Sequence, residues 1–327
     1  MNFVRKPDYS DVLHPGVAVD VTASMAPLVR GKGDPTAATV DGISWLSFQP
    51  VATGPVTIAI VHPPSPLHPG PIRYHIWANA DDDAIQAAVQ RMPLLLGVDD
   101  DSLAGWAAFD ELLAQTADLL PERVVEARRR HPGMRFTATG QLVDELLTVV
   151  LEQKVTQQQA RATWSWLAKT HGPPSPAGDP APKLAPRPET ILDIAPWQWH
   201  AGWVQPFMVR TLKTVASRAR AINRLAQKPL EHISTGLNSL PGIGPWTVAE
   251  TLQRTHGAAD YVAVGDFHIA HHVGEALTGK RTDDAGMLEL LEPWAGHRQR
   301  IVRLIYVSGI RFSRYGPRMA ATDFRDR

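Results

Sequence analysis

The hydrophobic period of the sequence changes at about residue 120, and this change constrains the fold more than any other feature. Short runs typical of β-strands, separated by turn residues, precede it. After it, apolar residues recur three and four positions apart, as on one face of a helix. The clearest run is Leu142, Val143, Leu146, Leu147, Val150 and Leu151. We therefore predict an α+β protein with an N-terminal antiparallel sheet and helices over residues 1–120 and a mostly α-helical domain over residues 121–327.

Within the first segment, four runs are predicted to form one antiparallel sheet: residues 17–22, 43–48, 56–61 and 73–77. Gly54-Pro55 and a proline-rich stretch separate the last three runs, as hairpin loops would. Asp81 and the two aspartates after it precede an apolar spacing typical of a helix. We expect an aspartate N-cap there, with acidic residues in the first turn.

The second segment contains a proline-rich interruption. Residues 172–188 include seven prolines and cannot form a helix or a central strand, so we expect an exposed, mobile loop. Further on, residues 209–225 have the spacing of one amphipathic helix. Its polar positions carry Arg210, Lys213, Arg218, Arg220 and Arg224. Such charges are usually solvated, and contact with nucleic-acid phosphates is the alternative.

Charge is distributed unequally along the chain. The formal net charge is zero, but residues 1–120 carry 6 basic and 14 acidic side chains, whereas residues 121–327 carry 27 and 19. A basic second segment can attract phosphates, although ordinary solvated charge explains the same count. The absence of cysteine excludes disulfides, thiolate catalysis and cysteine-ligated zinc or iron–sulfur clusters.

No apolar run is long enough to span a membrane, and residues 1–20 lack the charged-then-apolar order of a secretory signal. We therefore expect a cytoplasmic protein without a membrane partner, associated with the nucleoid if the source is prokaryotic. We also expect it to be a monomer.

The most informative local signal is the segment 237–250, LNSLPGIGPWTVAE. Gly242 and Gly244 flank Ile243, a spacing that permits a tight turn with exposed backbone N–H groups before a new helix. Backbone amides at a helix N-terminus can hold a phosphate, and two glycines let a sugar-phosphate backbone approach closely. A plain glycine turn between two packed helices is the alternative.

The string LPGIGPWTVAE resembles the helix-hairpin-helix of the DNA glycosylases (the HhH-GPD superfamily), and the 3-methyladenine DNA glycosylase II branch in particular. Three further segments are similar to this superfamily: VAVGDFHIAHHV, the pair Pro293-Trp294, and VLEQKVTQQQA at residues 150–160. The resemblance covers roughly residues 143–309, and the β-rich front is similar to the N-terminal domain of the same branch. It implies a two-lobed helical domain and a base-excision-repair enzyme that acts on damaged double-stranded DNA.

Carried over by residue, the resemblance implies the following roles. Asp266 is the catalytic residue. The base pocket comprises Trp246, Phe267, Trp294 and Glu250. Contacts to DNA come from Gly242, Gly244, Thr247, Gln153 and Lys154. The backbone carbonyls of Asn238, Leu240 and Ile243 can hold a monovalent cation, Na or K, and catalysis requires no cofactor.

The chemistry can also be argued from the residues. Cleavage of a purine N-glycosidic bond builds positive charge on the sugar, and one carboxylate beside that carbon stabilises it and can activate water. Lyases of the superfamily carry a Schiff-base lysine at the position of Trp246, which lacks an amine. Together with the resemblance, this implies a monofunctional glycosylase that flips and releases alkylated purines such as 3-methyladenine and 7-methylguanine. Their positive charge improves the leaving group and attracts tryptophan faces.

Several alternatives stay open. Asp266 follows Gly265 and precedes an apolar run, as an N-cap does, and capping can coexist with catalysis. A metal site formed by Asp266, His268, His271 and His272 is less favoured because no second carboxylate is near. Glu250 stands where close relatives can have an aromatic residue, which leaves the lesion open, hypoxanthine included. Lys154 replaces a familiar apolar wedge; its stem can fill the gap left by a flipped base, or the wedge is weaker. A non-catalytic DNA-binding protein is the rival function.

Overall fold

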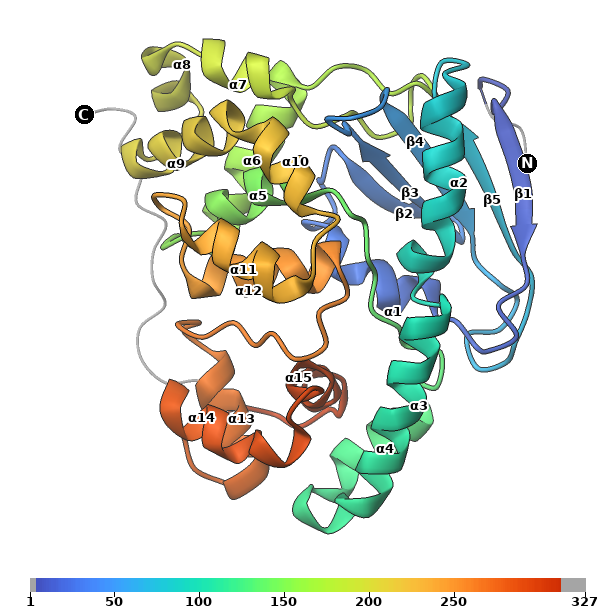
Figure 1. Ribbon diagram of the computed structural model, residues 1–327, viewed down its shortest axis with the longest axis vertical. Coiled ribbons are helices and arrows are strands. Elements are labelled where there is room, and N and C mark those ends of the chain that lie inside the picture. The colour runs from blue at the N-terminus through green and yellow to red at the C-terminus, as the bar shows by residue number, and fades with distance from the viewer. Residues whose placement is uncertain (1–3, 313–327) are drawn as a thin grey trace.

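The computed structural model describes residues 4–312 (Figure 1). Its single sheet is antiparallel, with the strand order β1-β5-β4-β3-β2. The strands are β1 (Tyr9–Leu13), β2 (Ala37–Val40), β3 (Ile43–Phe48), β4 (Val56–Val61) and β5 (Ile72–Trp77). The predicted strands 43–48 and 56–61 match in full, and the predicted 73–77 begins one residue earlier. The α+β class is confirmed, while β1 and β2 were not predicted.

The predicted strand at residues 17–22 is wrong. Helix α1 (Val21–Met25) occupies its second half, and before it only Ala18 forms a bridge, to Pro69. The Asp20 side chain accepts a hydrogen bond from the N–H of Ala23 at 2.9 Å and so starts the helix. Val19 and Val21 are both buried at the start of this helix. The alternation of apolar residues that resembled a strand therefore comes from a capped helical turn.

Two different layers cover the two faces of the sheet. Helix α2 (Asp82–Leu96) packs against β4 and β5. As predicted, Asp81 caps it, by accepting a hydrogen bond from the N–H of Ala84 at 3.0 Å. The opposite face of the sheet carries Ile43, Ala59 and Trp77, which cluster with a residue of the proline-rich tract.

That tract, residues 172–188, is not the exposed loop we predicted. Ala177 and Leu184 are buried, and the hydroxyl of Ser175 lies 2.8 Å from that of Thr57 on β4. Ser47 on β3 donates to the carbonyl of Pro182 at 2.7 Å. Prolines exclude helix and central strand, but they leave an extended segment free to cover a sheet face.

The other regular elements of the described chain are α-helices and three short 3₁₀ turns. In chain order these are η1 (Ala26–Leu28), α3 (Asp100–Gln115), η2 (Ala117–Leu119), α4 (Glu122–Arg130), α5 (Leu142–Leu151), α6 (Gln157–His171), α7 (Pro188–Asp193), α8 (Pro196–Ala201), α9 (Pro206–Ser217), α10 (Ala219–Leu225), α11 (Leu230–Asn238), α12 (Pro245–Thr255), α13 (Ile269–Thr278), α14 (Asp284–Leu290), η3 (Glu292–Trp294) and α15 (Arg298–Val307). The single helix predicted at 209–225 is divided in two at Arg218, which lies between α9 and α10.

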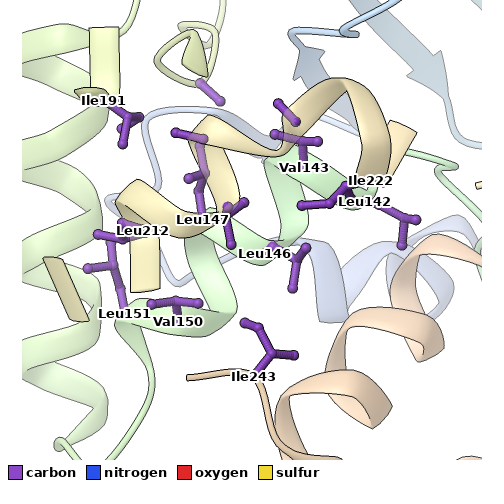
Figure 2. Packing of buried hydrophobic residues seen from close by; sticks show 14 of the residues in the cluster. Leu142, Val143, Leu146, Leu147, Val150, Leu151, Ile191, Leu212, Ile222 and Ile243 are labelled. Carbon is purple, nitrogen blue, oxygen red and sulfur yellow. The ribbon is translucent and has the colours of Figure 1, made fainter. Parts of the chain in front are cut away.

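The helices form two lobes, each with its own core. In one lobe, the apolar face of α5 packs against α9, α10 and the turn before α12; Figure 2 shows Val150 with Leu212, Ile222 and Ile243 around the same cluster. The other lobe contains α4 and α13–α15 (Figure 1). Trp106 and Phe109 of α3 also belong to this second core. The cores therefore do not divide at residue 120, because α3 packs with the C-terminal helices.

Within residues 4–312, no helix combines the length and the apolar character needed to cross a membrane.

Candidate active site

The glycine turn joins α11 to α12 and is fixed to the first helical core. Gly242 has φ +87°, and a Cβ there would lie 2.1 Å from Oγ1 of Thr211, so both backbone and space require glycine. Ile243 is buried in the core (Figure 2), and its N–H donates to the carbonyl of Leu240 at 3.0 Å. Gly244 differs: its φ is −112°, and a Cβ would meet nothing within 4 Å. The space beside Gly244 is open for a ligand.

Helix α12 begins without a side-chain cap. Gly244 is its N-cap and Pro245, which has no N–H, is its first residue. The first N–H used within the helix is that of Val248, which donates to the carbonyl of Gly244 at 3.0 Å. Among described residues, the N–H groups of Trp246 and Thr247 have no acceptor. Such a helix end is an anion site.

Gln153 connects the α5–α6 turn to this hairpin. Its Nε2 donates to the carbonyl of Gly242 at 2.9 Å and to Oγ1 of Thr247 at 2.8 Å. Thr247 is only 2% exposed and its hydroxyl accepts from Gln153, so its side chain is not available for the predicted phosphate contact. Lys154, the next residue, is exposed and has φ +54°. A left-handed backbone is unfavourable for lysine, and such strain is concentrated at functional sites.

Asp266 lies in the loop between α12 and α13, half-buried, and both of its carboxylate oxygens are engaged. Oδ1 accepts the N–H groups of His268 at 2.8 Å and Ile269 at 3.0 Å, a capping contact made from two residues before the N-cap His268. Oδ2 accepts the indole N–H of Trp246 at 3.2 Å. Gly265 precedes it with φ +90° and donates its N–H to Asp284 at 3.0 Å. The loop and the hairpin helix together therefore orient one carboxylate.

The four predicted pocket residues do not come together. Trp246 contacts Asp266, and Phe267 beside it is 76% exposed. Trp294, by contrast, is 1% exposed in the core of the second lobe, where its indole N–H donates to Thr116 at 2.8 Å, so it does not reach the surface beside Asp266. Glu250 is half-buried, and its Oε2 lies 2.7 Å from the guanidinium of Arg254.

Next to Asp266 lies a group of rings that sequence reasoning missed, here called the aromatic shelf: His268, His272, Tyr306 and Phe312. The His272 ring stacks on Phe312 at 4.0 Å and on His268 at 5.6 Å between centroids. The Tyr306 hydroxyl lies 3.1 Å from Nδ1 of His272. Burial and the charges of Asp266 and Glu250 raise the pKa of Tyr306, so its phenol stays neutral. Only the i, i+4 histidine spacing signalled this group in the sequence.

The histidines around Asp266 do not form a metal site. Nδ1 of His271 lies 2.8 Å from the carbonyl of Thr282, on a different side from the His268–His272 stack. Over the described range, no three histidine, aspartate or glutamate side chains converge as metal ligands. The arrangement of these side chains does not support the metal alternative for this segment.

No protein-family model and no curated protein matches the sequence. Solved structures do match. The 3-methyladenine DNA glycosylase from Archaeoglobus fulgidus has a TM-score of 0.72 at 13% identity, over 91% of this chain and 98% of that one. The 8-oxoguanine glycosylase/lyase from Clostridium acetobutylicum, in its apo form, has a TM-score of 0.67 at 8% identity, over 94% and 99%. Its complex with double-stranded DNA containing cytosine opposite 8-oxoguanine reaches 0.65 at 9%, over 93% and 98%. The chain thus has the fold of these DNA glycosylases along nearly its whole length.

Proposed function

We propose that this protein is a monofunctional DNA glycosylase that hydrolyses the N-glycosidic bond of flipped, alkylated purines in double-stranded DNA. The observation that carries this proposal is the carboxylate of Asp266, oriented by Trp246 and by two backbone N–H groups at the N-terminus of α13. The fold shared with two glycosylases of different lesion class supports the reaction type, not the lesion.

The carboxylate acts on the sugar. As the bond to the base lengthens, positive charge develops at the anomeric carbon, and a fixed anion beside it lowers the barrier. Water then attacks that carbon and loses a proton, which Asp266 can accept. Trp246 supplies no amine for a Schiff base, which favours hydrolysis over strand cleavage.

The base leaves from an aromatic environment. Trp246, Phe267 and the aromatic shelf present rings next to Asp266, and the neutral Tyr306 phenol adds a hydrogen-bonding group. A methylated purine that carries positive charge is attracted to such rings by about 0.5–2 kcal/mol per contact. The same charge makes the base a good leaving group, which favours 3-methyladenine and 7-methylguanine over neutral lesions such as hypoxanthine.

The hairpin grips the DNA strand. Its unpaired N–H groups suit a phosphate, and the open space at Gly244 admits the backbone. The carbonyls of Asn238 and Ile243 accept no hydrogen bond from a described backbone N–H, and that of Leu240 accepts one. Such oxygens fit a Na or K ion, which would stabilise the turn and take no part in bond cleavage.

Asp266→Asn tests the assignment. The amide oxygen can still cap α13, so the variant should fold and bind duplex DNA as the wild type does. Release of 3-methyladenine and 7-methylguanine from methylated duplex should fall about 100-fold or more, because the anion is lost. Undiminished release by the variant would exclude Asp266 as the catalytic residue.

Two further measurements separate the alternatives. Borohydride trapping should give no covalent protein–DNA adduct; an adduct would show lyase activity. Wild-type protein that binds duplex but releases no methylated, deaminated or hypoxanthine base would be a non-catalytic DNA-binding protein.

A further inference from the structure

The acidic N-terminal segment contributes one basic loop, residues 30–34 (RGKGD), between η1 and β2. The Arg30 guanidinium lies along α5: it forms an ion pair with Glu145, donates to the hydroxyl of Thr148 at 3.0 Å, and pairs with Glu152 at 3.3 Å. Glu152 directly precedes Gln153 and Lys154. The basic loop is therefore fastened to the turn that also holds the hairpin.

Asp34 holds the loop in shape. Its carboxylate accepts the N–H of Arg30 at 2.6 Å, that of Thr36 at 2.9 Å and the indole N–H of Trp164 at 3.2 Å. These N–H donors offset the negative charge of Asp34, and Arg30 offsets the charges of Glu145 and Glu152. Lys32 is therefore exposed at the tip of a loop whose backbone these hydrogen bonds hold in place.

The tip is built for close approach. Gly31 has φ +87°, and the guanidinium of Arg161 on α6 lies 3.1–3.2 Å from where its Cβ would be. Gly33 has open space beside it. Arg161 is exposed, and no described acid lies within ion-pair distance of Lys32 or Arg161. Two of the six basic residues in positions 1–120 lie in this one loop.

We propose that Lys32 and Arg161 form a second DNA-contact surface that binds phosphates of the strand opposite the lesion. The inference rests on the proposed function. Gln153 faces the hairpin and Glu152 faces Arg30, so the hairpin and the basic loop flank Lys154. With the hairpin on the damaged strand, the basic loop on the other side of this turn is placed to meet the complementary strand. It thereby offsets the repulsion between DNA and an otherwise acidic segment.

Salt dependence measures this contact. Each phosphate contact adds about 0.9 to the slope of log affinity against log salt concentration. Lys32→Ala should reduce that slope by about one contact and weaken binding about threefold to tenfold at low salt. The measurement is fluorescence anisotropy with a duplex that carries a stable abasic-site analogue, so no base release is needed.

Lys6→Ala is the matched control. Lys6 is also exposed, but it precedes β1, at the sheet edge opposite β2, which follows the basic loop. Its substitution should leave the slope unchanged. An unchanged slope for Lys32→Ala would overturn the inference and leave the glycosylase proposal intact, whereas wild-type protein that binds no duplex would overturn both.

Cross-linking identifies the strand. The chain has no cysteine, so Lys32→Cys introduces a single thiol. Duplexes are prepared with a disulfide-tethered thiol on one strand or the other near the abasic analogue. Disulfide exchange with the introduced cysteine then shows which strand lies next to position 32. The inference requires cross-linking to the complementary strand. Cross-linking to the damaged strand alone, or to neither, would refute it.

Discussion

Asp266 combines two roles in one side chain. One oxygen caps α13 and the other accepts the indole N–H of Trp246. The capping and catalytic interpretations are therefore compatible, because the carboxylate has one oxygen for each set of contacts. Stability and activity should respond differently to different substitutions at this position.

Asp266→Ala removes the cap and should lower the free energy of unfolding by about 1 kcal/mol, whereas Asp266→Asn, which keeps an acceptor oxygen, should lower it by much less. Urea denaturation of both variants measures the difference. Both should lose base release equally. Equal stability of the two variants would show that the carboxylate contributes nothing to the end of α13.

Single residues were predictable from the sequence only where their partners lie close in the chain. Asp81 as an N-cap and Asp266 as a cap depend on N–H groups two or three residues away. Trp294 depends on Thr116, which lies 178 residues away, and on a core that includes α3. Because no local pattern reports such a partner, its burial could not be foreseen.

At the scale of elements, the hairpin offers a matched pair of glycines. Gly244→Ala meets open space and an ordinary φ, so the fold should be retained while the added methyl blocks phosphate approach. Affinity for duplex should fall about tenfold, which is about 1.4 kcal/mol. Gly242→Ala should instead destabilise the protein by more than about 1 kcal/mol, because φ is positive and Thr211 is in the way.

Thermal unfolding and duplex binding, measured on both variants, check this contrast. The prediction fails if Gly244→Ala binds DNA like the wild type, since the turn would then be only a connection between two helices.

Among the secondary-structure elements, most of those with a clear local sequence signal were predicted and most of the others were missed. Strands β3 and β4 were found because two short apolar runs, rich in β-branched and aromatic residues, flank a turn signal and pair with each other. Edge strand β1 was missed because it is mostly exposed and pairs with the distant β5. Strand β2 pairs with β3 across Asp41-Gly42, so a local hairpin signal was overlooked there. The proline-rich tract was judged by what prolines exclude, and the sheet face that it covers is far away in sequence.

At the scale of the whole molecule, one face of α5 joins the sheet to the helical part. Glu145 on this face contacts both Arg30 from the N-terminal segment and, at 3.6 Å, Arg254 from α12. Asp144, beside it, lines a small cavity between the sheet and α5. Its carboxylate accepts the N–H of Gln49 at 2.8 Å. The junction thus contains an acid that the proposed reaction does not use.

Burial, followed by the nearby charge of Glu145, raises the pKa of Asp144 to about 7, against about 3.9 in an unfolded chain. The folded protein therefore holds a proton that the unfolded chain releases between about pH 4 and pH 7. This contribution to stability is present below pH 4 and is lost as pH rises through 7. A fully buried group would lose about 4 kcal/mol, and the residual exposure of Asp144 reduces this to about 2 kcal/mol.

Asp144→Asn cannot ionise and keeps an oxygen for Gln49, so it should become more stable than the wild type as pH rises from 5 to 8. Urea denaturation at both pH values gives the difference, and substitution of the exposed Glu111 by Gln serves as the control. A stability difference that is the same at pH 5 and pH 8 would mean that Asp144 titrates as an ordinary surface acid. In that case water would reach Asp144 at the junction between sheet and helices.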